Sequence, residues 1–157
     1  MKKLFLLFLA GILMMVSSTV ILAATYDSFL TIADVEKVSG LTGIKIVAKD
    51  PSKGAGGDLN FATADGKLVM MANFLNVRYF QEYKKQPSYF KAPVAGVGDE
   101  AFSGPKRDPQ YVLFFRKGNY CVTLSSFFNP EGTSTNPTML TMNQLIALGK
   151  TIAARIK

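Results

Sequence analysis

A long uncharged stretch at the start of the chain limits which residues are left to build a fold in water. Lys2 and Lys3 precede it, and residues 4–24 hold no charged side chain. A basic start, an apolar centre and small residues such as Ala23 and Ala24 are the layout of a secretory signal peptide. We therefore expect residues 1–24 to be a signal peptide and residues 25–157 to form a single domain.

The same stretch is also long enough to span a membrane as a helix. About 20 apolar residues in a helix span a bilayer, so an uncleaved N-terminal anchor is the alternative. No cysteine stands directly after the stretch, and we expect no lipid modification there. Cleavage would remove Lys2 and Lys3, lowering the basic residues from 18 to 16 against 11 acidic ones, for a net charge of +5. The predicted location is periplasmic or extracellular.

The composition excludes several catalytic classes. The chain has no histidine, no tryptophan and one cysteine, Cys121, while 48% of its residues are hydrophobic. Ser-His-Asp and Cys-His catalysis, zinc sites that need imidazole, and an internal disulfide are therefore excluded. We expect a folded protein that is not an enzyme and carries no cofactor or metal, with Cys121 buried in a strand.

The periodicity of apolar residues predicts an α+β fold. Helices are expected over residues 26–40, capped by Asp27 or Thr31 and ended by Gly40, over 77–85 after Asn76, and from Thr138 or Thr141 to the C-terminus. Strands are expected within residues 41–49, 58–63, 68–75, 100–102, 111–116 and 120–127, and a polar loop over 129–137. The prediction is a single antiparallel sheet of five or six strands, with the N- and C-terminal helices on one face and a short middle helix.

Several segments occur together in an order that resembles a known group. They are Ala33-Asp34-Val35-Glu36-Lys37-Val38-Ser39-Gly40, then Val94-Ala95-Gly96-Val97-Gly98-Asp99-Glu100-Ala101-Phe102, then Val112-Leu113-Phe114-Phe115-Arg116-Lys117-Gly118-Asn119, and a closing helix. The set resembles small exported bacterial domains of unknown function with a PsbP-like α+β sandwich. That resemblance implies an exported binding or accessory role and no catalytic residue.

Aromatic and basic residues are interspersed between positions 78 and 91. Rings offer contact area and lysines offer charge, so this cluster is the predicted contact surface for a ligand or partner. Its predicted residues are Tyr79, Tyr83, Lys84, Lys85, Tyr89 and Lys91. The alternative is structural: Phe80, Tyr83 and Phe90 pack the short helix on the sheet and the lysines are solvated.

Two further patterns have structural explanations that we favour. Gly96 and Gly98 precede Asp99 and Glu100, but a phosphate-binding loop would need a third glycine, and a strand turn explains the glycines. Adjacent carboxylates in a strand point to opposite faces, so they form no acid–base pair by themselves. Asp50 with residues 54–58 lacks the acidic pattern of a calcium loop, and a flexible connection is the simpler reading.

The sequence therefore predicts an exported, non-catalytic binding or accessory domain of the bacterial cell envelope. Its expected partner is an envelope protein or an anionic or small-molecule ligand, not nucleic acid, and a membrane only if the N-terminal segment is retained. The alternative is a membrane-anchored interaction or structural protein with an uncleaved N-terminal helix. An envelope hydrolase is the third possibility.

Overall fold

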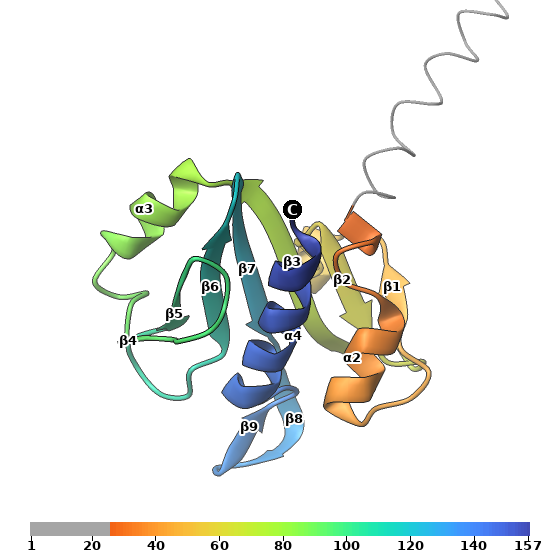
Figure 1. Cartoon of the computed structure of the whole chain (residues 1–157). Helices are drawn as coiled ribbons and strands as arrows, with labels where there is room; N and C mark the ends of the chain where they lie inside the picture. Colours follow the sequence, from red (N-terminus) through yellow and green to blue (C-terminus); the bar gives the residue numbers. More distant parts are fainter. Residues whose placement is uncertain (1–25) are drawn as a thin grey trace, which may run out of the picture.

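The computed structural model describes residues 26–157 and shows an α+β fold built on one large antiparallel sheet (Figure 1). The predicted signal peptide, residues 1–24, lies outside the described residues. The sheet has seven strands in the order β1-β2-β3-β7-β6-β5-β4. The strands are β1 (Lys45–Val47), β2 (Leu59–Ala62), β3 (Leu68–Asn76), β4 (Ala92–Pro93), β5 (Glu100–Gly104), β6 (Val112–Lys117) and β7 (Tyr120–Ser126).

The predicted strand number, five or six, was wrong because the short edge strand β4 was missed. Its two residues pair with Phe102 and Ser103 of β5. Proline has no N–H to donate, so Pro93 is tolerated at a sheet edge but argues against a strand in the sequence. The expected loop over residues 129–137 was also wrong. There, β8 (Phe128–Thr133) and β9 (Asn136–Thr138) form a separate antiparallel hairpin.

Two meanders meet at the centre of the sheet. Strands β1, β2 and β3 follow one another, as do β4, β5, β6 and β7, and β3 pairs with β7 over seven residue pairs from Met70↔Ser126 to Asn76↔Tyr120. Successive side chains of a strand point to opposite faces. The sheet therefore has two faces, and each carries its own apolar cluster.

The first face is covered by α2 (Ile32–Ser39) and α4 (Met142–Arg155). Each helix begins with a capping box, Thr31 with Asp34 and Thr141 with Gln144, in which side chains satisfy free N–H groups of the first turn. Gly40 ends α2 at a φ of 74°. Buried residues of this cluster include Val35, Phe61, Leu113, Phe115, Val122, Leu124, Leu145, Leu148 and Ile152.

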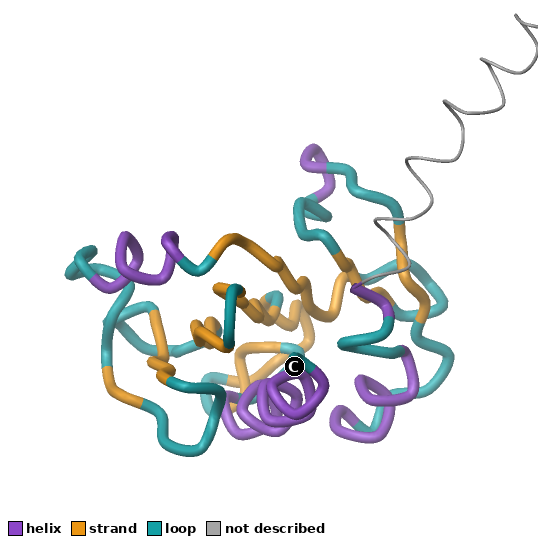
Figure 2. Tube along the Cα trace, turned by 45° about the horizontal axis from the view of Figure 1, so that its top comes forward, coloured by secondary structure: helices purple, strands orange, loops and turns teal. Residues whose placement is uncertain are grey.

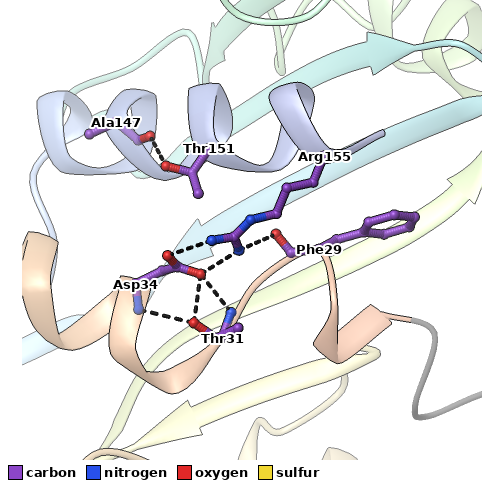
Figure 3. A network of polar contacts seen from close by, with 6 residues as sticks. All are labelled: Phe29, Thr31, Asp34, Ala147, Thr151 and Arg155. Atoms are coloured by element: carbon purple, nitrogen blue, oxygen red, sulfur yellow. Dashed lines mark hydrogen bonds and ion pairs between the residues drawn. The ribbon is translucent and has the colours of Figure 1, made fainter. Parts of the chain in front are cut away.

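An ion pair joins the two helices of this face (Figure 3). The Arg155 guanidinium lies 2.5 and 2.9 Å from the two carboxylate oxygens of Asp34, and it also donates to the carbonyl of Phe29 at 3.1 Å. Hydrogen bonds from Arg155 and Thr31 outweigh the effect of partial burial and lower the pKa of Asp34 to about 2. The start of α2 is thereby fixed to the end of α4.

The opposite face carries α3 (Arg78–Lys84), which Figure 2 shows on the other side of the strands from α2 and α4. Asn76 accepts a hydrogen bond from the Arg78 N–H at 3.0 Å, although Val77 is the residue that precedes the helix. The cluster here comprises Phe80, Phe102, Val112, Phe114 and Cys121. Among residues 26–157, no helix has the length and apolar character needed to cross a bilayer.

Candidate functional site

A pocket of about 640 Å³ opens where the chain after α3 passes the loop between β5 and β6. Its lining residues are Ser88, Tyr89, Pro105, Lys106, Arg107 and Tyr111. Ligand pockets in proteins have volumes of roughly 300–1,000 Å³, so this one is large enough for a small organic molecule.

Backbone hydrogen bonds join the segment after α3 to the β5–β6 loop and close that loop at its base. The Lys106 N–H donates to the Ser88 carbonyl at 2.9 Å, and the Tyr111 N–H donates to the Gly104 carbonyl at 3.0 Å. A Cβ atom at Gly104 would overlap the carbonyl oxygen of Tyr89. Glycine at this position therefore lets the segment after α3 lie directly on the end of β5.

Aromatic rings form the walls of the pocket and continue beyond it. The Tyr89 ring packs edge-on against Phe114 at a centroid distance of 5.8 Å and remains 41% exposed as a residue. The Tyr111 ring contacts Phe128, the first residue of β8, at 5.1 Å. Phe128 is 58% exposed. The pocket thus adjoins an aromatic surface that water reaches.

Lys106 and Arg107 supply the charge of the pocket. No carboxylate within residues 26–157 lies within 4 Å of either cation's charged nitrogens. The neighbouring Lys91 differs, because its Nζ lies 2.5 Å from Asp108 and lowers the pKa of that carboxyl group together with Gln110. Both pocket cations are therefore available to an anion.

The six predicted contact residues take part in different contacts in the structure. Tyr83 and Tyr89 lie together, with ring centroids 6.1 Å apart, and both touch Phe114. Three of the six are lysines that form ion pairs: Lys84 with Glu100, Lys85 with Glu82 and Lys91 with Asp108. Tyr79 faces the guanidinium of Arg78 instead. Of the six, Tyr89 alone is among the residues that line the pocket.

Five of the six pocket residues are not among the predicted contact residues: Ser88, Pro105, Lys106, Arg107 and Tyr111. No helix or strand is expected over residues 105–109, because Pro105 and Pro109 flank the two cations, and Tyr111 is expected only as the start of a strand. Two adjacent cations between two prolines, followed by a tyrosine, were the available signal. Pro and Gly place such residues on exposed connections, where binding groups are common.

The adjacent carboxylates Asp99 and Glu100 are both held ionised by neighbouring basic side chains. Asp99 lies 3.1 Å from the Lys117 amine and accepts from the Gly118 N–H, and these contacts lower its pKa. Glu100 pairs with Lys84 and with Arg116, and its pKa is also lowered. A general acid at neutral pH needs the opposite shift. Gly98 lies in a turn at a φ of 59°, and the next N–H donates to the Arg116 carbonyl.

The glycine-rich loop before β2 uses its carboxylates locally. Asp50 accepts from the Ser52 hydroxyl at 2.6 Å, and Asp58 accepts from the Phe74 N–H at 2.8 Å. Within the described residues, no three His, Cys, Asp or Glu side chains are grouped so that they could hold a metal ion.

Cys121 is fully buried, as predicted. It lies beneath α3 in the second cluster, and burial raises the pKa of its thiol to about 12. A neutral, enclosed thiol behaves as a small apolar side chain and is a poor nucleophile.

Three comparisons with known proteins found no relative of this chain. No protein-family model, no curated protein and no solved structure matches it.

Proposed function

We propose that this chain is an exported, non-catalytic binding domain of the bacterial cell envelope, and that the pocket around Lys106 and Arg107 takes an anionic ligand. The observation that carries the proposal is a pocket of about 640 Å³ with two cations that have no carboxylate partner among residues 26–157. The resemblance of the sequence to exported PsbP-like domains supports the same role.

The chemistry of the pocket favours an organic anion. A guanidinium donates two parallel hydrogen bonds to a carboxylate or phosphate, and a lysine adds a point charge. Tyr89 and Tyr111 offer ring faces and hydroxyl groups to the body of the same molecule. In this proposal Tyr83 supports Tyr89, and Tyr79, Lys84, Lys85 and Lys91 belong to a surrounding partner surface.

A titration with glucuronate, followed by backbone amide NMR, tests the proposed ligand site. We expect saturable shifts at Ser88, Lys106 and Tyr111, because these residues line the pocket. The double variant K106Q/R107Q should weaken binding at least tenfold, since it removes both charges. K37Q/K150Q is the matched control, because Lys37 and Lys150 are exposed and no ion pair of theirs is found within residues 26–157. Equal weakening in both double variants would contradict a specific site.

The location is tested separately by N-terminal sequencing of the native protein. A mature N-terminus at Thr25 supports export with cleavage. An intact Met1 on protein from the membrane fraction would contradict cleavage and support the membrane-anchored alternative. Tyr26 and Phe29 contact Phe74 and Tyr120 at one end of β3 and β7, so a retained anchor would join the molecule there.

A further inference from the structure

We infer that the ligand is an acidic polysaccharide, of which one acidic sugar enters the pocket and the next sugars lie over the rings of Tyr111 and Phe128. This inference rests on the proposed function, since it names the class of anion that the pocket binds. It adds a second contact region outside the pocket.

The first step is the aromatic surface that leads out of the pocket. Tyr111 lines the pocket and also contacts Phe128, with an angle of 56° between the two rings. Phe128 is the most exposed of the large hydrophobic residues in the described chain. Sugar rings present C–H faces that pack on aromatic rings and hydroxyl edges that bind water or tyrosine hydroxyls. A chain of sugars therefore fits a surface of this kind.

The second step is the charge beside that surface. Glu131 lies three residues after Phe128 on β8, where a free carboxylate would repel an acidic polymer. Its Oε1 atom accepts from the Lys67 amine at 2.6 Å, so this charge is already compensated. In the described part of the chain, the charges at the site that lack an ion-pair partner are then those of Lys106 and Arg107, and both are positive.

The third step concerns the source of the anion, because lipid headgroups carry the same charge. Membrane surfaces recruit clusters of four to eight cations, whereas Lys84, Lys85 and Lys91 are each neutralised by a carboxylate. The pocket lies near Gly104 and Val112, which pair at the level of Ser125 on β7. Tyr120, beside Tyr26 and Phe29, is five residues away, or roughly 17 Å along the strand.

The pocket therefore lies away from the end of the domain at which a retained leader would enter the membrane. This position favours a polymer as the ligand over a membrane lipid. Tyr26 and Phe29 pack on the face covered by α2 and α4, while Tyr111 packs with the α3 cluster on the other face. If the leader stayed in the bilayer, the pocket would lie away from the bilayer surface. A cleaved domain is free to meet polysaccharide in the envelope.

Calorimetric titration of the protein with galacturonate, digalacturonate and tetragalacturonate tests this inference. We expect the affinity to rise at least tenfold from the monomer to the tetramer. F128A should remove most of that gain with length, and K106Q/R107Q should abolish binding of every length. I46A is the control, because Ile46 is another exposed apolar residue but lies on β1, at the far edge of the sheet from β4 and β5.

The outcomes separate the inference from the function on which it rests. Galacturonate binding that depends on Lys106 and Arg107 but shows no gain with length would overturn the polysaccharide and leave the anion pocket intact. Equal affinity for uncharged maltotetraose would overturn the requirement for acid. Tighter binding to phosphatidylglycerol vesicles, lost in K106Q/R107Q, would assign the site to lipid. No binding of glucuronate or of any of these probes would refute both proposals.

Discussion

Two buried threonines differ in whether their hydroxyl groups are hydrogen-bonded. Thr138 Oγ1 donates to the Leu140 carbonyl at 2.8 Å. Thr123 Oγ1, in the middle of β7, has no hydrogen-bond partner among the described residues. A buried polar atom without a partner costs free energy, while a satisfied one contributes about 1 kcal/mol. The same substitution should therefore have opposite effects at the two positions.

The prediction is that T123V keeps or raises the free energy of unfolding, by up to about 1 kcal/mol, because valine has the shape of threonine without the hydroxyl. T138V should lower it by about 1–2 kcal/mol, because it leaves a buried carbonyl with one contact fewer. Urea denaturation followed by circular dichroism measures both. A larger loss in T123V than in T138V would show that the Thr123 hydroxyl has a partner.

At the scale of the element, the turn before β5 depends on one of its two glycines more than on the other. Gly98 has a φ of 59°, and a Cβ atom there would overlap the carbonyl oxygen of Arg116. Gly96 has a φ of 75°, but its nearest neighbour is the end of the flexible Lys150 side chain at 3.6 Å. Both glycines adopt left-handed backbone, and only Gly98 also lacks space.

We therefore expect G96A to lower the free energy of unfolding by about 1–2 kcal/mol, the cost of left-handed backbone for an L-residue. G98A should cost clearly more, because the backbone of β6 must also move. Urea denaturation of the two variants gives the comparison. Equal losses would mean that the overlap at Gly98 relaxes without cost.

The ion pair between α2 and α4 predicts a dependence of stability on pH. The pKa of Asp34 falls from an ordinary value of 3.8 to about 2 in the folded protein. A lowered pKa stabilises the fold above the ordinary value, and this contribution is lost as the pH falls toward 2. Because the Arg155 side chain is partly solvated, we expect this ion pair to contribute about 1–2 kcal/mol to the free energy of unfolding at neutral pH.

Unfolding in urea at pH 7, 4, 3 and 2 tests this prediction when the chain is compared with D34N. Asparagine keeps the size of the side chain and removes its charge. The difference in unfolding free energy between the two proteins should be largest at pH 7 and shrink below pH 4. Other carboxylates titrate in the same pH range in both proteins. The difference in unfolding free energy between the two proteins therefore isolates the contribution of Asp34. A difference that stays constant down to pH 2 would contradict the role of the charge.

Elements specified by neighbouring residues were predictable from the sequence. Thr31 and Thr141 were among the expected helix caps, and Gly40 was the expected end of α2. The β6–β7 hairpin turns at Gly118, between the strands expected over residues 111–116 and 120–127. The hairpin of β8 and β9 was missed because its side chains are mostly exposed and show no alternation. The packing of α3 on this face of the sheet depends on Phe102 and Phe114. These residues are distant from α3 in the sequence, so no local pattern predicts the contact.

At the scale of the whole molecule, the candidate site was only partly predictable because it depends on partners distant in sequence. Lys84 meets Glu100 and Lys91 meets Asp108, which lie 16 and 17 residues further along the chain. These contacts neutralise lysines that looked available between positions 78 and 91. The same folding brings Lys106 and Arg107 beside Tyr89. The sequence therefore located one side of the pocket and missed the charged side.

The two ends of the described chain lie close together, as the contact between Arg155 and the Phe29 carbonyl shows (Figure 1). Chains with neighbouring termini tolerate circular permutation. A short linker from Lys157 to Tyr26, with new ends opened at the exposed Asp65-Gly66 turn, would leave every strand of the sheet whole. Because the junction would lie away from the pocket, a fluorophore or a solid support attached there would leave ligand access unobstructed.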